Sequence, residues 1–232
     1  GKMLVRQVWT PQAGTMMIDD VGNPLDPGSG TARINDVEVT SSHINGNDHW
    51  KSLLTAVALC NLSTVSLETK GADPAQKSAA ASSPTWTAVG EPTEIALQVL
   101  ATRFDHGKPK LLEDGNFKFI AEHSFDSRIK RMSVVYHNNR TNMNEVYTKG
   151  ATEVLVPNML LNETEKAEVQ SQAEQMAGEG LRVLCVAMKS IPVADSDQYM
   201  KRELAEVGLT FLGLVGIYDP PRPETAGAVT RC

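Results

Sequence analysis

The chain has 232 residues, 41% of them apolar and 22% charged, a mixture typical of a soluble globular protein with a sizeable core. Its formal net charge of -6 argues against sequence-independent nucleic-acid binding, which needs a basic surface, but it allows a local basic pocket. The most apolar segment, 209–217, is much shorter than the roughly 18 apolar residues of a membrane helix, so we expect no membrane insertion.

Residues 10–46 are rich in glycine, proline and asparagine, which predicts short strands and loops. Asn47 has the character of an N-cap and predicts a helix over 48–60. The apolar stripe of this helix would consist of Leu53, Leu54, Val57 and Ala58.

The segment 70–84 has low complexity and no large apolar side chain. Because a packed core would gain nothing from it, we expect a flexible surface loop. Residues 89–94 then resemble a loop that opens a helix, with Pro92 in the first turn. The apolar face of that helix would consist of Ile95, Ala96, Val99, Leu100 and Phe104.

Strand patterns dominate the second half of the chain. Apolar and polar residues mostly alternate over 117–125, which predicts a strand. Residues 132–136 and 145–149 flank a polar turn and predict a hairpin. Two further strands are expected at 181–188 and 210–218.

Asn162 and Glu165 have the spacing of a capping box, which predicts a helix that ends near 178–180. Strands and helices interleave, but hairpins are more frequent than crossovers. We therefore expect an α+β fold in which helices flank a twisted antiparallel sheet.

The three cysteines, Cys60, Cys185 and Cys232, share no CxxC spacing, so we expect neither a disulfide framework nor a metal site. A reduced, cytosolic setting and a monomer are the corresponding expectations. The chain starts at Gly1 without an initiator methionine, and it stops where a helix pattern begins. We expect both ends to be cuts through a longer protein.

Short motifs occur in the same order as in the cytosolic ATP-binding region of P-type ATPases, which the chain resembles along essentially its whole length. They are GEPTE at 90–94, FDSRIKRM at 125–132, KGATE at 149–153, LRVL at 181–184 and DPPR at 219–222. The opening GKM resembles the residues directly after the phosphorylation motif DKTGTLT of that family. The opening segment through Trp9 and Pro11, together with the Asp26-Pro27 pair, looks most like the fungal sodium/potassium-extruding ATPases. Calcium pumps, which have proline where Thr152 stands, are the alternative.

The resemblance implies three segments: a connector strand from the phosphorylation domain at 1–9, a nucleotide-binding domain at 10–218 with its flexible loop at 70–84, and a hinge at 219–232. The domain would bind ATP and deliver the γ-phosphate to an aspartate on the phosphorylation domain, powering sodium/potassium export. Mg²⁺ would arrive with ATP, its protein ligands lying outside this chain. The expected partners are the phosphorylation and actuator domains of one cytosolic assembly at the plasma membrane.

The chain has no GxxxxGK[ST] loop to cradle phosphates, so a nucleotide would be held by its base. A flat apolar ring beside a cation suits adenine. Phe125 is the candidate ring, with core packing as the alternative, and Lys130 is the candidate cation, with a solvated surface lysine as the alternative. Glu94 could accept a hydrogen bond from the adenine amino group, or it could simply favour the helix dipole.

Further site residues come from the resemblance. Lys149 would line the floor of the adenine pocket, and Gly150 would permit close backbone approach. Arg182 would reach toward the phosphates. Asp219 and Arg222 would face the ribose and phosphates across a stiff two-proline connector. The alternatives are a hairpin lysine beside a turn glycine, an arginine at a strand junction and a plain linker.

We expect no catalytic residue in the chain, because the acceptor aspartate and the TGD and GDGxND motifs are missing. It should therefore bind ATP without hydrolysing it. A non-enzymatic interaction module is the rival, supported by the turn-rich residues 10–46 and the segment 70–84. A self-sufficient hydrolase ranks last, since the sequence contains no paired catalytic carboxylates, GxSxG or HExxH.

Overall fold

A nine-stranded sheet forms the centre of the computed structural model, which describes residues 2–69 and 83–221. Its strands lie in the order β4-β3-β2-β1-β11-β10-β9-β8-β7, and every neighbouring pair is antiparallel. The strands are β1 (Leu4–Thr10), β2 (Gly14–Asp19), β3 (Thr31–Ile34), β4 (Val37–Glu38), β7 (Phe117–Asp126), β8 (Arg131–Asn138), β9 (Met143–Gly150), β10 (Leu181–Pro192) and β11 (Thr210–Tyr218).

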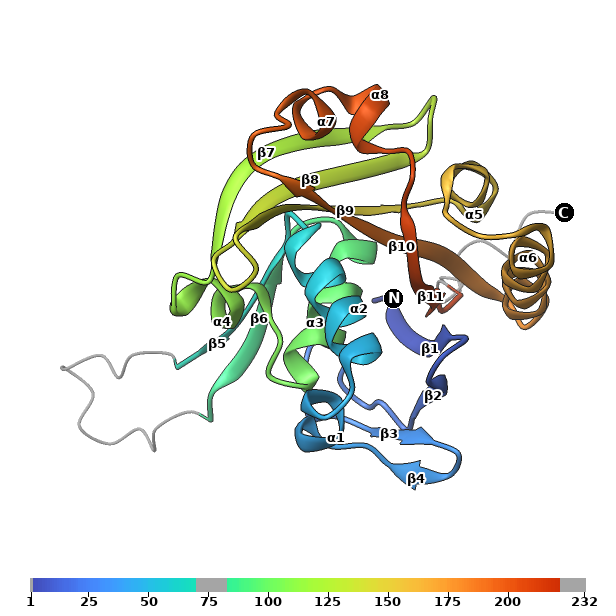
Figure 1. Ribbon diagram of the computed structural model, residues 1–232. Helices are drawn as coiled ribbons and strands as arrows, with labels where there is room; N and C mark the ends of the chain where they lie inside the picture. Colours follow the sequence, from blue (N-terminus) through green and yellow to red (C-terminus); the bar gives the residue numbers. More distant parts are fainter. Residues whose placement is uncertain (1, 70–82, 222–232) are drawn as a thin grey trace, which may run out of the picture.

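Helices cover both faces of this sheet (Figure 1). On one face lie α1 (Ser41–Asn45), α2 (Asp48–Leu59), α3 (Pro92–Arg103) and α4 (Lys108–Glu113). On the other lie α5 (Thr152–Leu155), the short 3₁₀ turn η1 (Val156–Asn158), α6 (Glu163–Gly178), α7 (Asp197–Met200) and α8 (Arg202–Ala205). The predicted α+β fold with a flanked antiparallel sheet is confirmed.

The packing of α2 is a direct consequence of its sequence. The Asn47 side chain accepts hydrogen bonds from the backbone N–H groups of His49 and Trp50, as an N-cap should. The predicted stripe of α2 is at most 1% exposed and packs with α3 against the sheet. The stripe residues are Leu53, Leu54, Val57 and Ala58. Burial of such a stripe stabilises the fold by roughly 1.5–3 kcal/mol per large aliphatic side chain.

The opposite face is closed mainly by α6. Asn162 accepts from the Glu165 N–H, and Glu165 accepts from the Asn162 N–H, which confirms the capping box. Val169, Ala173 and Met176 of α6 are buried in a second core against β10 and β11. The sheet is therefore the middle layer of three.

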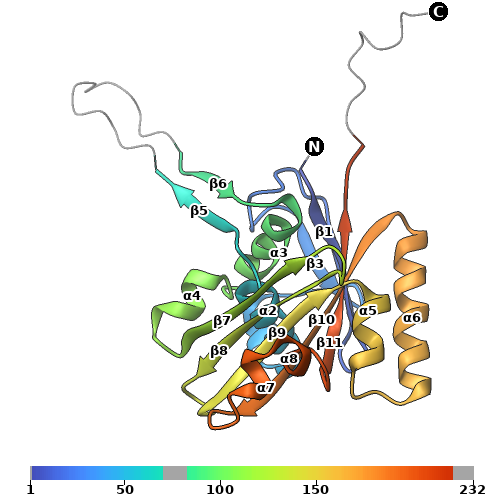
Figure 2. The ribbon, with the colours of Figure 1, turned by 90° about the horizontal axis from the view of Figure 1, so that it is seen from above.

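Several elements were not predicted. A separate two-stranded sheet, β5 (Thr64–Glu68) with β6 (Thr85–Val89), projects from the body, as Figure 2 shows. The predicted loop 70–84 falls between these strands, and its residues 70–82 lie outside the described part of the chain. The short helices α1, α4, α5, α7 and α8 span four to six residues each, too few to show a helical period.

Two predicted segments take a larger part in the sheet than expected. β1, within the predicted connector 1–9, is an inner strand between β2 and β11. β10 was predicted to end at Met188 and continues to Pro192, pairing with β9 from Cys185 to Pro192. Within residues 2–69 and 83–221, no helix has the length and apolarity needed to cross a bilayer.

Candidate nucleotide-binding site

One end of the sheet gathers the predicted site residues. The strand register sets Asp126 opposite Arg131, Arg131 opposite Gly150 and Gly150 opposite Cys185, and farther along it sets Leu181 opposite Tyr218. One end of the sheet, called here the site edge, therefore contains the end of β7, the start of β8, the end of β9, the start of β10 and the end of β11. Figure 2 shows the strands converging there. Phe125, Lys130, Lys149, Gly150, Arg182 and Asp219 all lie on the site edge.

Lys149 and Glu94 form a buried ion pair at this edge. The Lys149 Nζ lies 2.6 Å from the Glu94 Oε2, and the two side chains are only 8% and 13% exposed. The same carboxylate oxygen accepts a hydrogen bond of 3.0 Å from the Leu62 N–H. Because an unpaired buried charge is costly, each group requires the other. Lys149 is therefore buried and paired, and Glu94 has a cationic partner in addition to its place in the first turn of α3.

Phe125 is exposed at the site edge. Its side chain is 62% exposed, so the alternative of core packing is wrong. β7 is the outermost strand on its side of the sheet, and Phe119 on the same strand is 55% exposed as well. The alternation over 117–125 correctly predicts a strand, but it does not mark a fully buried face. An exposed aromatic ring offers a flat apolar surface to a ligand.

The turn from β7 to β8 is closed by Asp126. Its carboxylate accepts hydrogen bonds from the Arg128 backbone N–H at 2.9 Å and from the Arg128 guanidinium at 3.1 and 2.8 Å. Its backbone carbonyl accepts from the Lys130 N–H at 2.7 Å. The hydrogen-bonded Arg128 lowers the pKa of Asp126 to about 2, so the carboxylate is ionised at neutral pH. Sequence reasoning missed this residue, although an aspartate two residues before a backbone donor is a known turn signal.

Gly150 lies against the backbone of this turn. A Cβ at Gly150 would overlap the Lys130 carbonyl oxygen and would lie 2.9 Å from the Arg131 Cβ. The Ala151 N–H donates to the same carbonyl at 3.1 Å. The group that approaches Gly150 closely is thus the protein's own backbone at Lys130 and Arg131. It fixes Lys130, whose φ of 51° is left-handed, relative to β9.

The remaining cations are at the rim. The Lys130 Nζ is 3.5 Å from Glu153 Oε1, and the Arg182 guanidinium is 3.5 Å from Asp219 Oδ2. All four side chains are about half exposed or more, so each pair contributes little and can exchange partners readily. Arg222 lies outside the described part of the chain.

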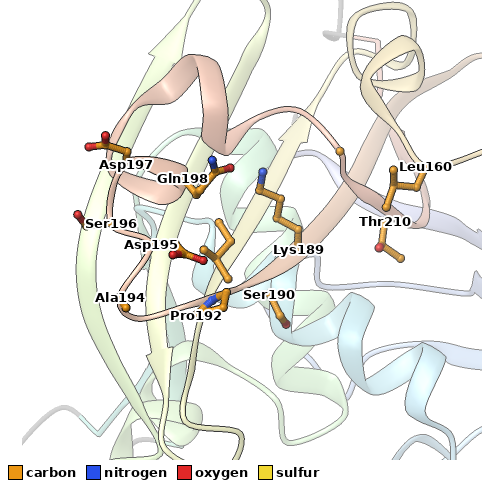
Figure 3. Close-up of a pocket in the computed structure, with 12 residues that line it drawn as sticks. Leu160, Lys189, Ser190, Pro192, Ala194, Asp195, Ser196, Asp197, Gln198 and Thr210 are labelled. Carbon is orange, nitrogen blue, oxygen red and sulfur yellow. The ribbon is translucent and has the colours of Figure 1, made fainter.

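A cavity of about 780 Å³ lies elsewhere in the described part of the chain (Figure 3). It lies beside the far end of β10 and includes none of the predicted site residues. Its Lys189 ammonium donates to the carbonyls of Leu204 at 2.7 Å and Val207 at 2.9 Å, and burial lowers its pKa. Lys189 is thus occupied in holding the β10–β11 connection. Across residues 2–69 and 83–221, no three His, Cys, Asp or Glu residues are placed to hold a metal ion.

Comparison with known proteins identifies the fold. The sequence profile of the family described as "P-type ATPase, cytoplasmic domain N" matches residues 49–224. The sodium/potassium exporting P-type ATPase cta3 of Schizosaccharomyces pombe is 39% identical over 250 positions, spanning all of this chain and 23% of that protein. The sodium/potassium exporting P-type ATPase 1 of Saccharomyces cerevisiae is 32% identical, again over all of this chain and 26% of that protein. A calcium-transporting ATPase of Bacillus subtilis is 30% identical over all of this chain and 24% of its own length.

The site edge and the flanked antiparallel sheet are therefore parts of a cation-ATPase domain. The chain belongs to the P-type ATPases, and residues 49–224 match the cytoplasmic N domain of that family. The resemblance drawn from the short motifs is confirmed. The chain spans about a quarter of the length of the fungal relatives.

Proposed function

We propose that the chain binds Mg-ATP at the site edge and presents its γ-phosphate to an aspartate on a neighbouring phosphorylation domain. The observation that carries this proposal is the presence of an exposed aromatic ring and a buried ion pair at the site edge. An exposed aromatic ring, Phe125, lies at the end of β7, and a buried ion pair, Lys149 with Glu94, lies two strands away. Such a site offers stacking and directional hydrogen bonds to a base, without a phosphate loop.

The adenine base would stack on Phe125, an interaction worth roughly 1–3 kcal/mol. Glu94 would accept a hydrogen bond from the adenine amino group through Oε1, because Oε2 already binds Lys149 and the Leu62 N–H. Lys149 would close the floor of the pocket with its alkyl chain. The pair would thus recognise the polar edge of the base while Phe125 holds its flat face.

The phosphates would be met by the rim cations. Lys130 and Arg182 are tied only by half-exposed ion pairs to Glu153 and Asp219, so turning toward a phosphate costs little. Arg222 would add a further positive charge. Mg²⁺ would come with the nucleotide, and its protein ligands would belong to the phosphorylation domain. The transfer itself would then depend on positioning and charge stabilisation.

The strand ends support a connection to that neighbouring domain. The first residue of β1, Leu4, pairs with the last residue of β11, Tyr218, at the site edge. A domain joined through 1–9 and 219–232 would therefore face the nucleotide. We further propose an actuator domain as the second partner, in a cytosolic assembly at the plasma membrane.

Sodium or potassium is the proposed exported ion, because the two fungal relatives are sodium/potassium exporters. Calcium is the second candidate, since the Bacillus subtilis relative transports calcium. Thr152, where calcium pumps have proline, begins the short helix α5 beside the site edge and favours the first candidate.

The test is a chemical-shift titration of the ¹⁵N-labelled chain with Mg-ATP up to about 10 mM. We expect a dissociation constant of about 0.1 to several mM, with shifts at Phe125, Lys130 and Lys149. Phosphate release by the same sample should stay at the level of a buffer control, because the chain supplies no acceptor aspartate. Shifts confined to the cavity beside β10, or no shifts at all, would refute the proposed site.

A further inference from the structure

The strand that carries Phe125 contains a bulge. In the β7–β8 register His123 faces Ser133 and Asp126 faces Arg131, so that Ser124 and Phe125 share a single opposing residue, Met132. A bulge of this kind re-aims a side chain and leaves backbone groups without their ladder partners. Any contact that fixes the bulge therefore fixes the orientation of Phe125.

Arg202 of α8 bridges the bulge from outside the strand pair. Its Nη2 donates to the carbonyl oxygen of Arg131 at 2.8 Å and to that of His123 at 3.4 Å. These two carbonyls flank the bulge and the adjoining turn, which together contain Phe125 and Lys130. The Arg202 Nη2 is thus hydrogen-bonded to the residues on either side of the segment 124–130.

Glu206 holds Arg202 in this position. Its carboxylate is only 1% exposed and lies 2.6 Å from the Arg202 Nε through Oε1. The same oxygen is 3.5 Å from the Arg131 Nε, and Oε2 accepts a hydrogen bond from the Ser133 hydroxyl. A buried carboxylate needs such partners. Glu206, Arg202 and Arg131 form what we call the brace.

The brace lies on the opposite face of the sheet from the Lys149–Glu94 pair. The Ser133 hydroxyl that bonds Glu206 is also 2.7 Å from the Thr148 hydroxyl. Because side chains alternate along a strand, Lys149 points to the other face. Figure 1 shows α7 and α8 over β7 and β8, across the sheet from α2 and α3. The brace therefore does not contribute to the proposed base pocket.

We propose that Arg202, held by Glu206, is a positioning residue for nucleotide binding, which acts through the bulge to set the ring of Phe125. The effect of Arg202 on nucleotide affinity rests on the function proposed above, whereas its effect on the conformation of the bulge does not. Loss of Arg202 should disturb residues 124–130 and weaken the binding of adenosine and ATP by similar factors, since both carry the base.

Arg202→Met is the test variant and Lys201→Met its matched control, because Lys201 precedes α8 and makes only an exposed ion pair with Asp197. Without ligand, Arg202→Met should shift and broaden the amide signals of 124–130, and Lys201→Met should not. Glu206 keeps Arg131 and Ser133 as partners in this variant, so the chain should remain folded, and a thermal melt checks this. Arg202→Lys, which retains the charge, is a milder second variant.

The decisive measurement is a double-mutant cycle. Arg202→Met should lower adenosine and ATP affinity about 2- to 30-fold in the natural background and not at all in a Phe125→Ala background. The upfield shift of the adenine H2 and H8 signals should fall with it. Equal losses in both backgrounds, or unchanged amide signals at 124–130, would overturn the role of Arg202. A natural chain that binds no ATP would instead refute the proposed function, and the ligand-free amide signals would still decide whether the brace sets the bulge.

Discussion

Replacing Phe125 by alanine separates base stacking from folding. The ring is 62% exposed, so its truncation removes little buried apolar surface and should cost less than about 1 kcal/mol of unfolding free energy. Loss of the stacking contact should cost roughly 1–3 kcal/mol of binding free energy, a fall in affinity of about 5- to 150-fold. Adenosine should lose as much affinity as ATP, because both present the same base.

Phe119→Ala is the matched control for this experiment. Phe119 is on the same strand and similarly exposed at 55%, but it packs edge-on against Tyr136 with ring centroids 5.6 Å apart, away from the site edge. Chemical-shift titrations of both variants, with thermal melts, supply affinity and stability together. Phe125→Trp should retain most of the binding. Equal affinities for the natural chain and Phe125→Ala would refute Phe125 as the adenine platform.

Three further perturbations test the other parts of the site. Lys130→Met should lower the affinity for ATP more than the affinity for adenosine. Raised salt should reduce the preference of the natural chain for ATP over adenosine, because salt screens the rim charges. Equal losses of affinity for both ligands would contradict a role of Lys130 in phosphate binding. Lys149→Met should lower the free energy of unfolding by roughly 3 kcal/mol in urea titrations, since it leaves Glu94 buried without its cation, and adding Glu94→Gln should recover part of the loss. Gly150→Ala should destabilise by about 1–3 kcal/mol because its Cβ would overlap the Lys130 carbonyl, whereas Gly178→Ala, with open space around it, should be neutral or stabilising; similar midpoints for the two would contradict the close-approach argument.

Local signals in the sequence predicted local structure well. The Asn47 cap with its stripe placed α2, and the Asn162–Glu165 capping box placed α6, because each is complete within one turn or a few turns of chain. The hairpin of β8 and β9 was predicted from two short runs, 132–136 and 145–149, that flank a polar turn. In these elements the residues that determine the structure are neighbours in sequence.

The features that the sequence did not reveal join distant residues. Glu94 and Lys149 are 55 positions apart, and each separately resembles an ordinary surface charge. The Arg202 guanidinium reaches a carbonyl 71 positions away, from a helix of four residues that has no period to detect. The bulge at Ser124 and Phe125 breaks the register without breaking the alternation of residue types, so a pattern of period two continues through it unnoticed.

The side-by-side placement of β1 and β11 determines how the domain would respond to mechanical load. Leu4 and Tyr218 are partners, and the ladder continues from them into the sheet as far as Trp9 opposite Leu214. Tension that separated Leu4 from Tyr218 would act first on the hydrogen bonds of that residue pair and then on each following pair in turn. Such peeling requires less force than shearing all rungs at once. The paired ends of β1 and β11 would therefore be the first part of this ladder to open under such tension.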